Sequence, residues 1–194
     1  ALEYELIDTG VFDDDRYFDV YVEYAKSAPE DVLIKITICN RGAEDATLHV
    51  LPTLWFRNTW AGAPGTPKPS LRRMTTKEGQ PIIAATHADL GERWLCVEGD
   101  VPLVFTDNET NNNRIDGTDN PGPYVKDGIN DYVIYGRKSA VNPDGTGTKA
   151  AAHHICHVKA GGSVVLRFRF MEAARNKSID PFAGYDRIFE RRVK

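Results

Sequence analysis

Apolar and polar residues alternate with a period of two along most of the chain. Residues 18–24 (FDVYVEY) and 34–39 (IKITIC) place an apolar side chain at every second position. Successive side chains of a β-strand point to opposite faces, so each segment predicts a strand with one buried and one hydrated face. Residues 2–6 (LEYEL) show the same alternation. Further strands are predicted at residues 46–56, 81–87, 93–98, 103–106, 131–135, 150–158 and 163–170.

The connections between these strands are of two kinds. Residues 40–45 (NRGAED) are polar and contain glycine, which predicts a hairpin between the strands on either side. Residues 159–162 (KAGG) predict a tight hairpin between the last two strands. Connections as long as residues 58–80, 107–128 and 136–148 are uncommon and often functional, so we expect the chemistry there.

Helical spacing of apolar residues is mostly confined to the end of the chain. Asp180 and Pro181 are a plausible cap and first helical position, and apolar residues follow at positions 182, 185, 188, 189 and 193. A run of strands without alternating helices predicts an all-β fold, mainly an antiparallel β-sandwich of the supersandwich kind, followed by a C-terminal helix.

Both ends of the chain suggest excision from a longer polypeptide. The beginning lacks the basic and apolar regions of a signal peptide, and the last helix lacks a Gly or Asn cap. An ordinary frayed C-terminus is the alternative explanation.

Composition narrows the class of protein. A chain of 194 residues suits one domain, and its apolar runs are far shorter than the roughly 20 residues that span a bilayer, so we expect a soluble protein without a membrane partner. Net charge is −4 and both signs are interspersed, which argues against nucleic acid as a partner. The three cysteines, Cys39, Cys96 and Cys156, form no ligand pair and predict buried thiols in a reducing, cytoplasmic compartment.

Several long stretches resemble one family in the same order and over nearly the whole chain. They are residues 4–20, 51–60, 105–112 and 124–132, followed by Asn142-Pro143 and residues 147–151. They are similar to the N-terminal region of large prokaryotic proteins of glycoside hydrolase family 63, related to mannosyl-oligosaccharide glucosidase. Strings of this length are far more specific than a short motif.

The resemblance implies a two-part enzyme that inverts anomeric configuration. Its N-terminal β-sandwich would pack on an (α/α) barrel that holds both catalytic carboxylic acids, roughly 6.5–9.5 Å apart. This chain resembles the sandwich alone, so no catalytic residue is expected in it, and no cofactor or metal. Residues 1–180 would form the sandwich, and residues 181–194 would begin a linker helix towards the barrel, the expected partner in the same parent chain.

Residues 55–60 (WFRNTW) are the first candidate for binding an oligosaccharide or glucoside, because indole faces cover sugar C–H surfaces and polar groups bind the hydroxyls. On a strand Trp55 and Trp60 point to opposite faces, so one of them is expected in the core. In the structural alternative the aromatic residues fill the sandwich and Arg57 pairs with an acid. The candidate substrate-binding residues are Trp55, Arg57, Asn58, Trp60, Asp107, Glu109, Asn111, Tyr124, Lys126 and Asp127.

The polar loop at residues 107–120 has three possible explanations. Its oxygen atoms could bind calcium, although the spacing does not match an EF-hand. Its Asx residues could simply close turns with their own side chains, or the loop could reach the active site of the parent enzyme.

Two other polar clusters predict no site. Residues 13–16 (DDDR) predict a solvated turn, because successive side chains point apart. His153 and His157 share a strand face but are about 13 Å apart, too far for one zinc ion.

Two further hypotheses stay open beside the accessory domain. One is a free-standing carbohydrate-binding module. The other is a structural domain without a ligand, which would be favoured if Trp55 and Trp60 were both buried. An excised sandwich should also expose an apolar surface near the last helix or along one sheet face.

Overall fold

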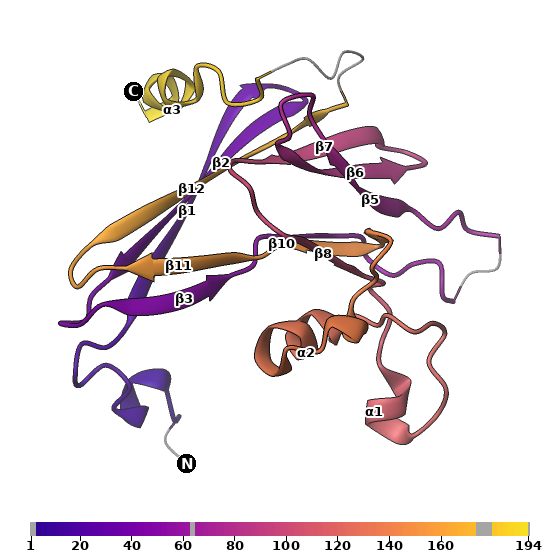
Figure 1. Ribbon diagram of the computed structural model, residues 1–194, viewed down its shortest axis with the longest axis horizontal. Helices are drawn as coiled ribbons and strands as arrows, with labels where there is room; N and C mark the ends of the chain where they lie inside the picture. Colours follow the sequence, from indigo (N-terminus) through magenta and orange to yellow (C-terminus); the bar gives the residue numbers. More distant parts are fainter. Residues whose placement is uncertain (1–2, 63–64, 174–179, 194) are drawn as a thin grey trace.

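The predicted fold class is confirmed: the chain forms mainly antiparallel sheets and ends in a short helix (Figure 1). The computed structural model describes residues 3–62, 65–173 and 180–193, with the side chain of residue 193 left out. Among the described residues, no helix is long and apolar enough to cross a membrane.

One large sheet forms the first layer. Its seven strands follow the order β1-β2-β12-β7-β6-β5-β9, and every neighbouring pair is antiparallel. The bounds are β1 Phe18–Ala28, β2 Asp31–Asn40, β12 Ser163–Glu172, β7 Gly91–Val97, β6 Pro81–His87, β5 Ser70–Thr75 and β9 Thr146–Gly147.

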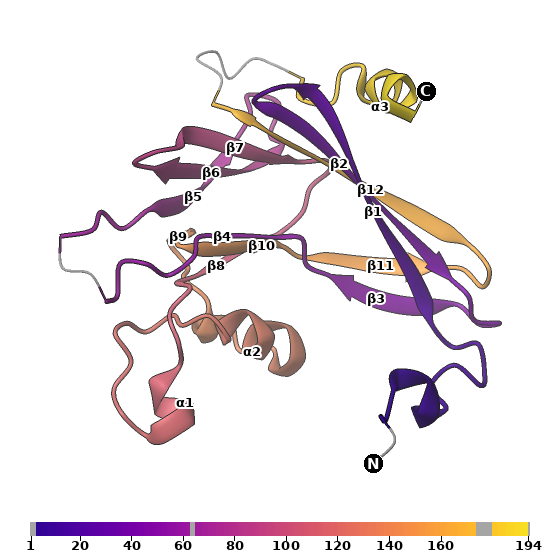
Figure 2. The same ribbon diagram turned by 180° about the vertical axis from the view of Figure 1, so that it is seen from behind.

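Two smaller sheets lie on one side of the large sheet and form the second layer (Figures 1 and 2). One has the order β4-β10-β8 and the other pairs β11 with β3. Their bounds are β3 Ala46–Val50, β4 Thr53–Trp55, β8 Leu103–Thr106, β10 Lys149–Ala152 and β11 His154–Val158. Short helices complete the fold: η1 Leu6–Thr9, α1 Asn112–Asp116, α2 Gly128–Tyr135, η2 Lys138–Ala140 and α3 Tyr185–Val193.

The main core lies between the two layers. Phe168 and Ile38 from the large sheet and Phe105 and Ala150 from the second layer are almost completely buried in one cluster. Alternation brings this about, since β11 buries His154, Cys156 and Val158 and exposes the residues between them. The predicted alternation of buried and exposed residues is therefore observed in β11, whereas in β1 the apolar residues Val20, Val22 and Tyr24 are exposed.

Helix α3 packs on the large sheet near the hairpin end of β1 and β2. Tyr185 and Phe189 are buried against Ala25 and Leu33. The Tyr185 hydroxyl donates to the backbone oxygen of Ile34 over 2.6 Å, and burial is the main reason why its pKa is raised. Whether this helix leads on towards a barrel stays a prediction.

The helix begins later than predicted. Asp180 caps a turn rather than the helix: its Oδ1 accepts from the backbone N–H of Phe182, and Gly184 follows with a φ of 68°. The first helical residue is therefore Tyr185 and not Pro181. The side chain at position 193, which completed the predicted apolar spacing, lies outside the described residues.

Both predicted hairpins are wrong. β2 pairs with β1 and β12, whereas β3 pairs with β11, so residues 40–45 cross from one layer to the other. Residues 159–162 do reverse the chain, with φ of 62° at Gly161, but they join β11 in one layer to β12 in the other. Local turn chemistry cannot distinguish these arches from hairpins, because strand pairing is decided by contacts distant in sequence.

Four other local predictions also fail. Residues 131–135 belong to helix α2, whose Ile129 and Tyr132 pack against the second layer. No strand forms at residues 3–6, because residues 3–5 are in no regular element and residue 6 begins the 3₁₀ helix η1; residue 2 lies outside the described residues. The predicted loop at residues 58–80 contains strand β5, and the predicted strand at residues 150–158 is divided between β10 and β11.

The cysteine prediction holds for two of the three thiols. All three are free; Cys96 and Cys156 are buried, whereas Cys39 is half-buried. Burial raises the pKa of Cys96 to about 12. That thiol is consequently a packing residue at neutral pH.

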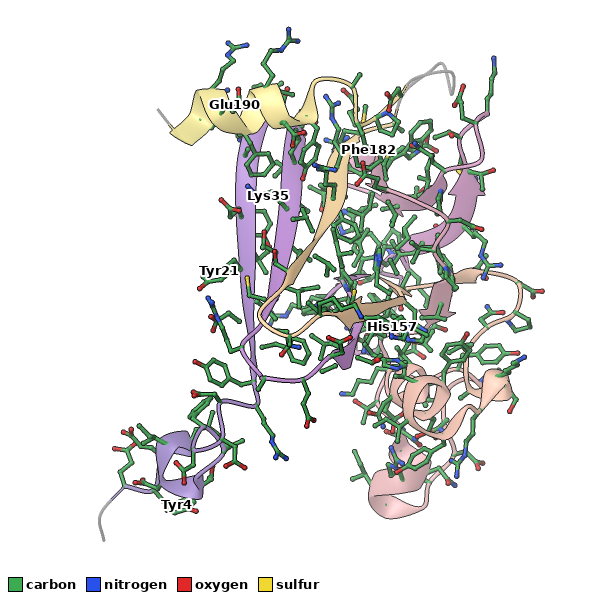
Figure 3. All side chains as sticks on the ribbon, turned by 60° about the vertical axis from the view of Figure 1, so that its left-hand side comes forward. Tyr4, Tyr21, Lys35, His157, Phe182 and Glu190 are labelled. Carbon is green, nitrogen blue, oxygen red and sulfur yellow. The ribbon has the colours of Figure 1, made fainter. Side chains whose placement is uncertain are left out.

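An apolar surface is exposed along β1, as expected for one sheet face. Val22 and Tyr24 are 46% and 69% exposed on this edge strand. They border an open cleft of about 430 Å³ between the layers, which Ile34, Leu54 and Phe170 also line. Figure 3 shows Tyr21 on the outer side of β1, and Tyr4 on the N-terminal segment that extends away from the body of the protein.

The core can be tested with Phe168→Ala. Because Phe168 is 1% exposed, we expect the free energy of unfolding, measured with urea, to fall by about 3–5 kcal/mol. Leu90→Ala is the control, since Leu90 is exposed in a turn and should change the free energy by less than about 0.5 kcal/mol. Equal losses in the two variants would contradict the assigned core.

Candidate functional site

The segment after β8 and the segment before β5 meet in a cluster of polar side chains. Glu109 is buried, and its Oε1 accepts from Trp60 Nε1 over 2.8 Å and from Lys68 Nζ over 3.1 Å. Lys68 Nζ also lies 3.1 Å from Asp107 Oδ2, and Thr148 Oγ1 donates to Asp107 Oδ1 over 3.1 Å. We call these five residues the carboxylate cluster.

A close backbone approach holds the carboxylate cluster together. The backbone N–H of Thr148 donates to the oxygen of Thr106 over 3.1 Å. A Cβ atom on Gly147 would lie 2.2 Å from that same oxygen, so only glycine permits the approach. Thr148 is thereby placed beside Asp107, where its hydroxyl accepts from the backbone N–H of Asn108 while it donates to the Asp107 carboxylate.

Lys68 is the charge that links the two acids. Burial alone would lower the pKa of Lys68, but hydrogen bonds to Asp107 and Glu109 outweigh it, and the net shift is upward. Lys68 Nζ also lies 5.8 Å from the centre of the Trp60 ring. The ammonium is therefore held in its charged form between two carboxylates.

Asp107 and Glu109 do not have the arrangement that inverting hydrolysis requires. The general acid and general base of inverting enzymes are roughly 6.5–9.5 Å apart, with room for a water molecule. Here one oxygen of each acid lies 3.1 Å from the same nitrogen, so these two oxygens are closer together than that. The two acids are positioned for an ion pair with Lys68.

A second cluster joins helix α1 to helix α2. Arg114 donates to Asp127 over 2.6 Å and lies 3.5 Å from Asp131, which also pairs with Arg137. Asn111 donates to both carboxylate oxygens of Asp127, and its own Oδ1 accepts from the backbone N–H of Arg114. The hydrogen bond to Asp127 is the main reason why the pKa of Arg114 is raised.

The polar loop at residues 107–120 closes its turns with its own Asx side chains. Asp116 Oδ1 accepts from the backbone N–H and the hydroxyl of Thr118, and Asn120 Oδ1 accepts from the backbone N–H of Asn113. Of the three explanations given for this loop, these hydrogen bonds agree with the one in which Asx side chains close turns. Within the part of the chain that the structure describes, no group of three or more His, Cys, Asp or Glu side chains is arranged to hold a metal ion.

The histidines form separate pairs. His153 Nε2 lies 2.9 Å from His49 Nδ1, and His157 Nδ1 lies 2.8 Å from Thr47 Oγ1. His154 is buried edge-to-face against Phe168, and its Nε2 has no hydrogen-bond partner within the described residues. The residues at positions 13–16 are exposed in a turn, as predicted.

The ten candidate residues do not form one site. Trp60, Asp107 and Glu109 meet in the carboxylate cluster, and Asn111 and Asp127 meet in the second one. Neither tryptophan lies in the core, which corrects the expectation for residues 55–60: the strand ends at Trp55, so the chain can turn Trp60 towards Glu109.

The remaining candidates have more modest contacts. Arg57 is exposed and makes no ion pair within the described residues, so its pairing with an acid is not observed. Asn58 Oδ1 accepts from the backbone N–H of Ala61, and the Tyr124 backbone oxygen accepts from the backbone N–H of Asp107. Lys126 Nζ donates to Thr110 Oγ1 over 3.1 Å.

Sequence reasoning missed Lys68, Arg114, Thr148 and Lys149. Lys68 lies in a Gly/Pro-rich stretch without any periodic pattern, so nothing local distinguishes it. Thr148 and Lys149 belong to residues 147–151, which had been noticed only for their resemblance to a family. Contacts between segments that are distant in the sequence bring these residues to the two clusters and to their surroundings.

Comparison with known proteins identifies one relative and no family. No family model matches the sequence. An uncharacterized protein of Saccharomyces cerevisiae (strain ATCC 204508 / S288c), YMR196W, is 32% identical over 214 aligned residues, which cover 92% of this chain and 20% of the yeast protein. The chain thus spans about a fifth of the length of this curated relative.

The carboxylate cluster can be tested with Glu109→Gln. The amide still accepts from Trp60 but no longer pairs with Lys68, so we expect the free energy of unfolding to fall by about 1 kcal/mol. Chemical denaturation of the purified chain measures it. Glu78→Gln, at an exposed position of a turn, should leave the free energy of unfolding unchanged. If Glu109→Gln also left it unchanged, the ion pair with Lys68 would contribute nothing to stability.

The buried histidine predicts a pH dependence. The pKa of His154 is lowered to about 4, first by burial and second by the charge of His153, from 6.5 when unperturbed. Between pH about 6.5 and 4 the unfolded chain binds a proton that the folded chain does not, so stability falls as pH falls through this window. Urea unfolding at pH 7 and 4.5 should show a smaller loss for His154→Gln than for the unmodified chain. His87→Gln should keep the original loss, and identical losses in all three proteins would contradict the assignment.

Proposed function

We propose that this chain is the non-catalytic β-sandwich part of a larger, cytoplasmic, inverting glycoside hydrolase of the α-glucosidase type. In this role it supports a catalytic (α/α) barrel of the same parent chain and lends its loop clusters to the edge of the sugar site. The resemblance of residues 4–20, 51–60, 105–112 and 124–132 to family 63 supports this function. The yeast relative, five times as long as the aligned part, is compatible with a longer parent chain.

The exposed apolar surface is the single observation that best supports the proposal. The edge strand β1 exposes Val22 and Tyr24 beside an open apolar cleft, and the N-terminal segment exposes Tyr4, Leu6 and Ile7. Exposed apolar surface of this kind marks an interaction site in soluble proteins. A helical barrel, packed through its own apolar residues, would remove this surface from water.

The ion pairs that the acids form support a non-catalytic role. Asp107 and Glu109 share Lys68, and Asp127 and Asp131 pair with Arg114 and Arg137. A general acid or base must lie within hydrogen-bond reach of the group that it protonates or deprotonates. These four carboxylates are instead engaged by cations of the chain itself.

A carbohydrate-binding module is the second candidate function, and one observation favours it. Trp55 is 54% exposed at the end of β4, so about half of its surface is open to solvent. The third hypothesis, a structural domain without a ligand, depended on two buried tryptophans, and this condition is not met.

The proposal predicts that the purified chain hydrolyses no α-glucosidic substrate. Malto-oligosaccharides and a chromogenic α-glucoside should remain intact, because the acids that would protonate the leaving group belong to another domain. Turnover that disappears in Asp107→Asn or Glu109→Gln would overturn the proposal. Calorimetric titration with malto- and manno-oligosaccharides addresses the alternative, since saturable binding by the chain alone would favour a free-standing module.

A further inference from the structure

A groove of about 560 Å³ lies between helix α2 and the strands of the second layer. One wall is formed by residues of and just before α2, among them Lys126, Asp127 and Asn130. The other wall includes Thr53 of β4 and Lys149 of β10. The size lies within the range of small-ligand sites, roughly 300–1,000 Å³.

Two lysine ammonium groups give this groove its charge. Lys149 Nζ donates to the backbone oxygen of Lys126 over 2.9 Å, and Lys126 Nζ donates to the Thr110 hydroxyl. Among the residues that the structure describes, neither ammonium lies within 4.0 Å of a carboxylate oxygen. Both of their identified acceptors are neutral oxygen atoms.

The acid that lines the groove does not offset these charges. Asp127 is already bound by Arg114 over 2.6 Å and by Asn111. Asp131, the next acid on α2, is bound by Arg137. The charges of the two acids and the two arginines balance, which leaves the positive charges of Lys126 and Lys149 in excess.

The environment of Lys149 favours the binding of an anion. Burial, first, and the neighbouring charge of Lys126, second, lower the pKa of Lys149, although Asp127 partly opposes this. A half-buried ammonium in a groove, with a perturbed pKa, is a candidate for a functional site. A bound anion would stabilise both ammonium groups in their charged form.

An aromatic platform lies next to these lysines. Trp55 is directly opposite Lys149 in the β4–β10 register, so both side chains are on the same face of the sheet. Thr53, two residues earlier on the same face of β4, lines the groove. The exposed indole of Trp55 is therefore adjacent to the end of the groove where Lys149 lies.

We propose that this groove binds a saccharide that bears an anionic group, a carboxylate or a phosphate. The anion lies between Lys126 and Lys149, the sugar ring packs on the Trp55 indole, and Asn130 and Thr53 serve the hydroxyl groups. This inference rests on the proposed function only in taking the ligand to be a saccharide.

The experiment is a calorimetric titration of the intact 194-residue chain with glucuronate, glucose 6-phosphate, glucose and inorganic phosphate. We expect glucuronate or glucose 6-phosphate to bind at least about tenfold more tightly than glucose and than inorganic phosphate, a difference of about 1.4 kcal/mol. The tighter of the two identifies the anionic group. Binding should weaken as sodium chloride is raised, because the contact is ionic.

Three variants locate the site. Lys126→Met and Lys149→Met each remove one ammonium and keep an apolar stem, and each should lower the affinity at least about tenfold. Trp55→Ala should weaken binding of the sugar anions but not of inorganic phosphate. Lys77→Met is the matched control at an exposed turn and should bind as the unmodified chain does. Circular dichroism verifies that each variant is folded. Lys126 is the more exposed of the two lysines, so Lys126→Met still tests the site if Lys149→Met unfolds.

The proposal is overturned if no probe binds, if glucose binds as tightly as the sugar anions, or if both lysine variants keep full affinity. Inorganic phosphate that binds as tightly as glucose 6-phosphate would also overturn it, because an anion site without sugar recognition would remain. Tighter binding of an acidic peptide, with a poly-glutamate peptide as the probe, would assign the groove to a protein partner instead. None of these results affects the non-catalytic role, whereas hydrolysis by the chain would overturn that role and leave the groove untouched.

Discussion

Burial of apolar side chains between the seven-stranded sheet and the two smaller sheets is the constraint on which the rest of this structure depends. Phe105 and Phe168 contribute to this core from opposite layers and are 0% and 1% exposed. Strand β8, which contains Phe105, ends at Thr106, and Asp107 begins the polar segment that contains Glu109, Asn111 and helix α1. Packing of β8 into the core therefore also positions the residues that could meet a ligand.

Charge pairing then determines which of the polar residues remain available. Four of the acids after β8 form ion pairs with Lys68, Arg114 and Arg137. Lys126 and Lys149 have no such partner among the described residues. Lys149 is half-buried, and an unpaired charge there costs free energy, so it points to a ligand more strongly than a paired charge does.

The apolar surface along β1 also points to a binding partner, in this case another protein domain. An edge strand leaves its outer backbone groups unpaired, and natural sheets usually protect such edges with charges, bulges or a covering element. β1 has a register shift between Lys26 and Ala28, but Val22 and Tyr24 remain exposed beside an open cleft. Packing against a further domain would protect this edge, and this accords with the proposed accessory role.

The sequence by itself determined the fold class, most of the strands and the presence of a final helix. Strand alternation is a local property, and residues such as Ile34, Ile36 and Ile38 reveal it within a few positions. The aromatic and polar residues of the sequence also indicated that the candidate side chains would lie in residues 55–60 and 107–127. Tertiary structure alone decided that β2 and β3 belong to different layers, that residues 131–135 are helical, and that Lys68, Thr148 and Lys149 join the sites. Each of these depends on contacts between segments far apart in the chain, and the free energy of such contacts is not encoded in any single stretch of residues.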